Sequence, residues 1–161
     1  MRSRFTKVAL GLVLALSLMG ASYASVDQSG ASGAAAQKVK IVAKEYRLMG
    51  IPKKIDAGET VFTFKNKGTE VHEALIMKLL HGRKIEKLLK LPEKKAMKHV
   101  KIIGAVFAKP GKKAKKPLEA DLKKGRYVAL CFVPAPDKTP HFAMGMLHKF
   151  RVVNYPRFHI G

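Results

Sequence analysis

Three side chains that bind metals follow one another near the end of the sequence. Cys131, the single cysteine, lies in the apolar run 127–133. Nine residues separate it from His141, and four more separate His141 from Met146. A thiolate, an imidazole and a thioether are three of the four ligands of a mononuclear blue copper centre. The spacing therefore predicts a copper site on one loop.

The fourth ligand must come from another part of the chain, and His72 is the candidate. It follows the turn-forming residues 65–68 and precedes the apolar run 74–77. Soft sulfur ligands favour the reduced copper ion, imidazoles serve both oxidation states, and a weak thioether bond tunes the reduction potential. We therefore expect one-electron chemistry at such a site.

Each candidate ligand also has an ordinary structural interpretation. A cysteine in an apolar strand is often only a small buried hydrophobic residue. His72 and His141 could be a strand residue and a loop residue without further role, and Met144 competes with Met146 for the axial position. The other histidines match no ligand pattern and are predicted to lie at the surface: His81, His99, His148 and His159.

The N-terminal residues indicate export. Basic residues precede the apolar core 8–19, and small residues at 22–24 suit a cleavage site, so residues 1–24 are predicted to be a signal peptide. Residues 25–37 are rich in small residues and predict a flexible linker. Residues 38–161 would then form one domain in the periplasm or outside the cell, where a free thiol is well explained as a metal ligand.

The chain is strongly basic, with a net charge of +21. Removing residues 1–24, which contain three basic and no acidic residues, would leave +18. Such a surface favours acidic proteins, polyanions or an anionic membrane surface as partners. Nucleic acid is disfavoured because tryptophan is absent, aromatic residues are 7% of the chain, and no reader motif is present.

Apolar residues alternate with polar ones in most of the chain, which predicts an all-β fold. Strands are expected at 38–44, 61–64, 71–79 and 147–153, together with a hairpin formed by 118–122 and 126–133. Residues 85–91 have helical spacing. The lysine-rich residues 93–117 are expected to form an excursion containing a short strand or helix. About seven short strands indicate a Greek-key β-sandwich with a helical, lysine-rich insert at 81–117.

With these elements in place, residues 38–155 resemble a cupredoxin, the single-domain blue copper fold of plastocyanin and azurin. The resemblance rests on residues 66–73 and on the segment 131–146. It implies that His72, Cys131, His141 and Met146 bind one type 1 copper, and that the chain is an electron carrier and not an enzyme. It also implies a monomer that works with a redox protein partner. The nine-residue gap after Cys131 is longer than in small cupredoxins.

The resemblance carries further expectations about the surroundings of the site. Asn66 is expected to brace the turn before His72, and Glu73 to hydrogen-bond to the ligand loop. Phe132 and Phe142 should shield the metal from water. The ring edge of His141 should open onto an apolar patch of Pro134, Ala135, Pro140 and Phe142, where electrons would enter and leave.

Two other functions stay open from the sequence. A copper-handling protein could use the same ligands to exchange metal instead of electrons. A polyanion-binding module of cupredoxin type could use the basic surface and need no copper. An independent oxidase or reductase is disfavoured, because the sequence offers no pattern for a second metal site.

Overall fold

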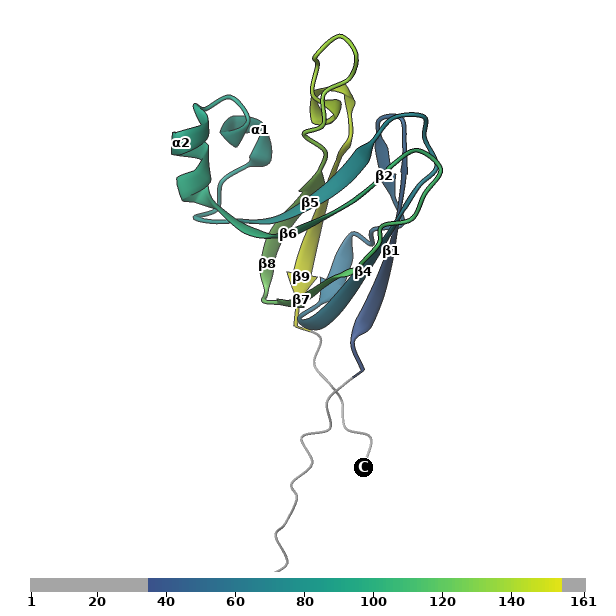
Figure 1. Cartoon of the computed structure of the whole chain (residues 1–161). Helices are drawn as coiled ribbons and strands as arrows, with labels where there is room; N and C mark the ends of the chain where they lie inside the picture. The colour runs from purple at the N-terminus through teal and green to yellow at the C-terminus, as the bar shows by residue number, and fades with distance from the viewer. Residues whose placement is uncertain (1–34, 155–161) are drawn as a thin grey trace, which may run out of the picture. The chain divides into compact units, whose positions relative to one another are not determined.

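The computed structural model describes residues 35–154 as a β-sandwich of two mixed sheets (Figure 1). One sheet has the order β2-β1-β4-β7, with bounds Arg47–Met49, Gln37–Lys44, Gly58–Asn66 and Leu118–Leu122. The other has the order β3-β9-β8-β5-β6, with bounds Lys54–Asp56, Leu147–Val153, Gly125–Leu130, His72–Leu79 and Val100–Ala108. The predicted all-β sandwich is confirmed. The predicted signal peptide and most of the predicted linker lie outside the described residues.

Alternating side chains fill the space between the two sheets. In β1, Val39, Ile41 and Ala43 are buried, as the alternation with lysines predicts. Phe62 and Phe64 of β4 join them from the same sheet, and the opposite sheet contributes the rest of the core. The core continues up to Cys131 and Met146, so two of the predicted ligands belong to the close-packed interior.

A short helical segment covers part of the outer face of the five-stranded sheet. It consists of α1 (Ile85–Leu88), α2 (Glu93–Ala96) and the 3₁₀ helix η1 (Met97–His99). Ile85 and Leu88 are buried in a second apolar cluster with Val128 and Leu130 of β8. This explains why β8 is buried on both faces, as its unbroken apolar sequence predicts.

The predicted hairpin of residues 118–133 is wrong. β7 pairs with β4 in one sheet, whereas β8 pairs with β5 and β9 in the other. The chain therefore crosses from sheet to sheet at residues 123–124. A short polar turn between two strands is compatible with either arrangement, because local sequence does not specify which neighbour each strand pairs with.

The lysine-rich stretch 93–117 contains more regular structure than its sequence indicates. β6 has nine residues and forms the edge of the five-stranded sheet, antiparallel to β5. Most of its side chains are exposed or half-buried, so the usual alternation of buried and exposed residues is weak. The expected short strand is thus a full edge strand.

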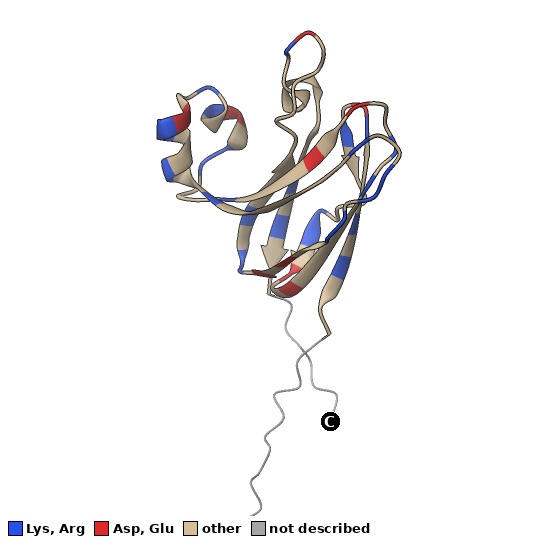
Figure 2. Ribbon diagram, in the orientation of Figure 1, with Lys and Arg blue, Asp and Glu red and all other residues tan. Residues whose placement is uncertain are grey.

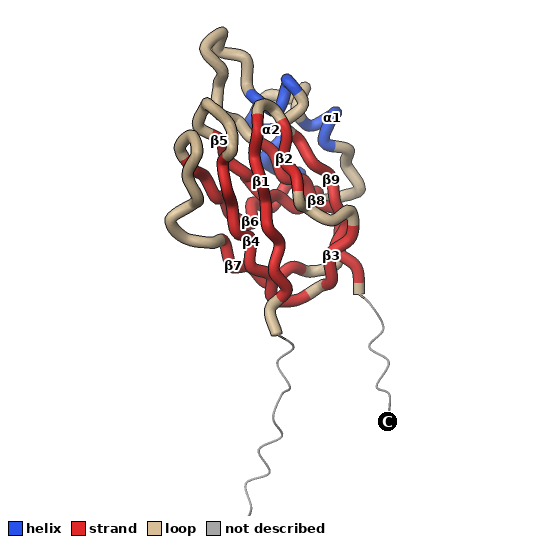
Figure 3. Tube along the Cα trace, turned by 90° about the vertical axis from the view of Figure 1, so that its right-hand side faces the viewer, coloured by secondary structure: helices blue, strands red, loops and turns tan. Residues whose placement is uncertain are grey.

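Figure 1 and Figure 3 place the helices and the loop 131–146 toward one end of the sandwich, while β1 begins and β9 ends at the other. Within residues 35–154, no helix has the length and apolar character needed to span a bilayer.

Candidate metal centre

Neighbouring strands of the five-stranded sheet bring the predicted ligands to the same end of the sandwich. His72 is the first residue of β5, and Cys131 directly follows the last residue of β8. β5 and β8 are hydrogen-bonded neighbours with Leu75 opposite Leu130, so the two side chains lie just beyond the paired region. His141 begins the 3₁₀ helix η2 (His141–Met144), which leads back to β9.

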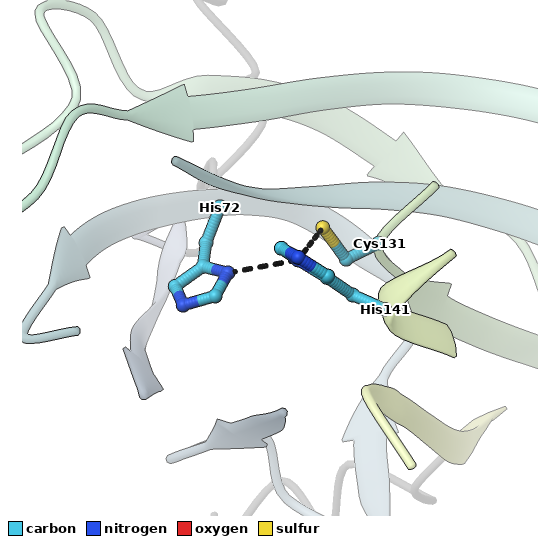
Figure 4. Close-up of side chains that lie close together, drawn as sticks. All are labelled: His72, Cys131 and His141. Atoms are coloured by element: carbon cyan, nitrogen blue, oxygen red, sulfur yellow. Dashed lines mark hydrogen bonds between the residues drawn. The ribbon is translucent and has the colours of Figure 1, made fainter. Parts of the chain in front are cut away.

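Three donor atoms meet in a buried cluster (Figure 4). The Nδ1 atoms of His72 and His141 are 3.1 Å apart, and the Sγ of Cys131 is 3.4 Å from Nδ1 of His141. All three ligand atoms lie within 4.8 Å of one another, and all three residues have no exposed surface. Among the described residues this is the one cluster of histidine, cysteine and acidic side chains arranged to hold a metal ion.

The loop between Cys131 and His141 is a short hairpin extension, which explains its length. Pro134 and Pro140 lie opposite each other, and the N–H of Ala135 donates to the carbonyl of Thr139 at 2.9 Å. The N–H of His141 donates to the carbonyl of Val133 at 3.0 Å. These main-chain bonds and the fixed φ of the prolines hold His141 in place without help from a metal.

Met146 is also at this end of the sandwich. Its carbonyl accepts from the N–H of Cys131 at 3.2 Å, its N–H donates to the carbonyl of His141 at 3.0 Å, and its side chain is fully buried. Met144, the competing residue, is half-buried at the end of η2 and is not part of the core. These positions favour Met146, although Met146 as the axial ligand stays a prediction.

Asn66 braces the segment before His72, as expected. It is fully buried, its Oδ1 accepts from the N–H of Gly68 at 2.8 Å, and its Nδ2 donates to the carbonyls of Glu70 and Ala108. Every polar atom of this side chain has a partner, so the turn 66–70 is tied to β6 as well as to itself.

Glu73 connects the start of β5, where His72 lies, to the loop that begins at Cys131, again as expected. Its Oε1 accepts from the N–H of Phe132 at 2.9 Å, and its own N–H donates to the Sγ of Cys131 at 3.4 Å. A hydrogen bond to sulfur favours the thiolate form, which is the form that binds metal.

The ring of His141 does not open onto an apolar patch, so this expectation is wrong. Nε2 of His141 donates to Oε2 of Glu70 at 2.8 Å, and Tyr46 donates to the other oxygen of Glu70 at 3.1 Å. The Tyr46 ring also packs on the imidazole, with centroids 5.1 Å apart. A carboxylate and a phenol therefore occupy the edge of the ring.

A second carboxylate lies beside His72. Oε1 of Glu45 is 3.6 Å from Nε2 of His72, a buried nitrogen without a hydrogen-bond partner in the described part of the chain. The main-chain N–H of Thr69 donates to the same oxygen, and this bond, with weaker ones from the Thr69 hydroxyl and Glu70, lowers the pKa of Glu45 to about 2. Glu45 is therefore ionised at neutral pH.

Burial also sets the protonation of the ligands. It raises the pKa of the Cys131 thiol, because the charged thiolate loses water. It lowers the pKa of His72, and the neighbouring His141 adds to this effect. In the metal-free protein Cys131 is thus a thiol and His72 is neutral at pH 7.

The remaining predicted residues do not belong to the cluster. His81 is exposed, His99 and His148 are half-buried, and His159 lies outside the described residues. Phe132 is 43% exposed and meets the ring of Phe142 edge to face at a centroid distance of 5.0 Å. Phe132 was expected to shield the site from water, and its exposure shows that this expectation is wrong.

Sequence reasoning missed Glu45, Tyr46 and Glu70. Glu70 precedes His72 by two residues, and its acidic side chain in a basic protein could have drawn attention to it. Glu45 and Tyr46 form the turn between β1 and β2. Nothing local in the sequence places that turn beside the ligands.

No known family profile matches the sequence, and no curated protein matches it. Solved structures do. A dithionite-reduced auracyanin from the photosynthetic bacterium Roseiflexus castenholzii is 24% identical, with a TM-score of 0.50 and coverage of 74% of this chain and 99% of that chain. Auracyanin B is 13% identical, with a TM-score of 0.51 and coverage of 73% and 89%.

A third similar structure, auracyanin A from Chloroflexus aurantiacus, is described as a blue copper protein; it is 20% identical, with a TM-score of 0.49 and coverage of 72% and 98%. The first two similarities confirm the cupredoxin fold inferred from the sequence.

Proposed function

We propose that this cupredoxin-fold protein is an exported electron carrier that binds one copper ion through His72, Cys131, His141 and Met146. The observation that supports it most is the convergence of two Nδ1 atoms and one Sγ in a fully buried cluster at the end of the sandwich. Soft sulfur and imidazole ligands in this combination suit copper better than calcium or magnesium, which prefer oxygen.

A metal ion would replace only the contacts among the three donor atoms, and the hydrogen bond on the outer side of the His141 ring would stay. Glu70 accepts from Nε2 of His141, which places the proton of the neutral ring on Nε2 and leaves the lone pair of Nδ1 directed at the cluster. The same arrangement is available to His72, because Glu45 lies on its Nε2 side. A carboxylate behind a ligand histidine fixes its tautomer and orientation.

Copper bound there would supply a single-electron couple. The chain contributes a fixed set of ligand positions: β5 holds His72, the end of β8 holds Cys131, and the main-chain bonds of the loop hold His141. Burial keeps water from the donor atoms. A frame that is already formed favours fast electron exchange, because little has to move when the charge changes.

Metal binding must also displace a proton from Cys131, because burial keeps the thiol protonated in the metal-free form. Apparent copper affinity should therefore increase with pH. The deep burial of this site argues against rapid transfer of the metal to another protein, which a copper-handling function would require.

The visible spectrum of copper-loaded protein tests the proposal. Wild type should show an intense absorption band from the thiolate, which Cys131→Ser should abolish. Met146→Leu should keep the band and change the reduction potential, whereas the matched Met144→Leu should change neither. A wild-type protein that stays colourless after loading would contradict the proposal.

One observation favours polyanion binding as a second candidate function. An open cavity of about 850 Å³ between α1 and the outer face of the sheet is lined mostly by basic side chains. Among them are Lys53, Arg83, Arg126, Lys149 and Arg151. If this is the function, heparin binding should survive Cys131→Ser and be lost in Arg126→Ala/Arg151→Ala.

A further inference from the structure

A second opening, next to the metal centre, is apolar. It is a groove of about 460 Å³ between the helical segment and the outer face of β5 and β6. Leu75, Met77 and Leu88 are among its lining residues, and Phe132 and Phe142 belong to it as well. Figure 1 shows the helices standing beside β5 and β6 at the same end of the molecule as the ligand loop.

The two phenylalanines connect this groove to the cluster. Phe132 follows Cys131 in the chain, and Phe142 follows His141. Their rings are in contact, and the N–H of Phe142 donates to the carbonyl of Cys131 at 2.8 Å. Each of two predicted ligands is therefore one residue away from the groove. Electron tunnelling falls steeply with distance and is better through covalent bonds than through gaps, so this is a short route out of the site.

The other side of the cluster offers a poorer route. Glu70 and Tyr46 cover the ring edge of His141, and Glu45 lies beside His72. An acidic partner would meet two carboxylates there and be repelled.

The groove itself exposes unpartnered apolar surface. Leu91, Met97, Ile102 and Phe132 line it and are 40%, 42%, 48% and 43% exposed. A continuous apolar patch of this kind, bordered by polar residues, is typical of an interaction site.

The chain segment beside the groove is basic. Figure 2 shows basic and acidic positions on both short helices, and basic residues outnumber acidic ones in the segment 81–101. Several exposed lysines are close in sequence to the groove-lining residues of the segment 88–102: Lys90, Lys94, Lys95, Lys98 and Lys101. A positive rim around an apolar centre is complementary to a negative rim around an apolar protrusion.

We propose that this groove, here called the phenylalanine groove, is where an acidic redox protein docks and exchanges electrons through Phe132. The inference rests on the proposed electron-carrier function. The occupant is a protein and not a membrane, because the apolar surface is concave and accepts an inserted side chain, whereas a bilayer surface requires apolar groups that protrude.

Stopped-flow kinetics with an acidic c-type cytochrome as the probe test the proposal. Met97→Ser/Ile102→Ser changes exposed groove residues that are not candidate ligands and should lower the second-order rate constant about tenfold, as loss of a central contact does. Its control, Met49→Ser/Phe107→Ser, removes apolar residues outside the groove that are 40% and 67% exposed, and should change the rate constant less than about twofold. Phe132→Leu should slow the reaction while leaving the visible band in place.

Charge reversal gives an independent comparison. Lys94→Glu/Lys98→Glu should slow the reaction at low salt and lose this effect at high salt, whereas Lys38→Glu/Lys40→Glu on β1 should have a much smaller effect. Equal effects of groove and control variants would overturn the proposal. So would groove variants that abolish binding to phosphatidylglycerol vesicles and leave the cytochrome kinetics unchanged.

Amide chemical-shift mapping of copper-free protein with the same cytochrome separates this inference from the proposed function. Shifts confined to the groove, combined with a copper-loaded protein that shows no one-electron couple, would overturn the carrier function and leave the docking surface supported. A normal couple with shifts centred on residues 45–46 and 70 would overturn the docking surface alone.

Discussion

The two sides of the candidate metal centre differ in polarity and in hydrogen bonding. On the histidine side, Glu45, Tyr46 and Glu70 form a polar, hydrogen-bonded layer over the imidazole rings. On the cysteine side, Phe132 and Phe142 lead from the ligands to an apolar groove with a basic rim. One side fixes the ligands, and the other offers a surface to a partner.

Charges of opposite sign are separated around the candidate site. The carboxylates concentrate on the Nε2 side of the histidines, where negative charge would support imidazole ligands if a metal is bound. The lysines of the helical insert stay at the surface, where water screens them. Substitutions on each side should therefore have separable effects.

The largest expected effect is on the cysteine side. Leu88 of α1 is 2% exposed and packs with Val128 and Leu130 behind the ligand loop. Leu88→Ala should lower the free energy of unfolding by about 3 kcal/mol, because it leaves a cavity in this cluster. Chemical denaturation measures the effect, and Leu91→Ala, at an exposed position of the same segment, should change stability by less than about 0.5 kcal/mol. Equal effects would mean that the insert is not part of the cooperative domain.

The histidine side should lose somewhat less when its brace is removed. Asn66→Ala deletes the partner of three main-chain groups, those of Gly68, Glu70 and Ala108. We expect a loss of about 2 kcal/mol, because buried groups are left without hydrogen bonds. The exposed Asn154→Ala serves as the control in the same denaturation series. Stability unchanged in Asn66→Ala would show that the turn before His72 does not depend on this side chain.

These two sides also differ in how far the sequence predicts them. The candidate ligands of the loop could be predicted from the sequence, because Cys131, His141 and Met146 lie within one segment and the spacing of unlike ligand types is specific. The strand pattern likewise predicted β1, β5, β8 and β9, whose buried faces alternate or are continuously apolar.

The histidine side depends on contacts between distant segments. Glu45 accepts hydrogen bonds from Thr69 and Glu70, which lie 24 and 25 positions later in the chain. Glu70 accepts from His141 across 71 positions. The pairing of β7 with β4 is equally remote. Such contacts follow from the order of strands in the sheets, and a local pattern does not contain that order.

Glu70→Gln tests whether the histidine side tunes the metal. The variant keeps the shape of the side chain and removes the negative charge that accepts from Nε2 of His141. In copper-loaded protein the reduction potential should rise by roughly 40 mV, which corresponds to about 1 kcal/mol for one electron, since a nearby carboxylate stabilises the oxidised, more positive state. Redox titration measures it, and Glu119→Gln on β7 is the exposed control. A potential equal to that of wild type would confine Glu70 to a structural role.

Glu45→Gln should produce the smallest effect on stability, and the size of this effect depends on pH. The folded-state pKa of Glu45 is lowered from 4.5 to about 2, so its ionised form stabilises the native state at pH above 4.5. This contribution is lost as pH falls from 4.5 toward 2, because the native carboxylate then takes up the proton that the unfolded one already carries. The side chain is one-third exposed, at 34%, so the difference between wild type and variant at pH 6 should stay below about 1 kcal/mol.

Urea denaturation at pH 6, 4.5 and 3 checks this, with Glu59→Gln, an exposed residue of β4, as the control. The difference between wild type and Glu45→Gln should shrink across the series and that of the control should not. A difference that stays constant with pH would mean that the hydrogen bonds from Thr69 stabilise the glutamine as well as the carboxylate. The negative charge beside His72 would then contribute nothing to folding stability. The hydrogen bonds of the histidine side would stabilise the fold through their geometry and not through the charge of Glu45.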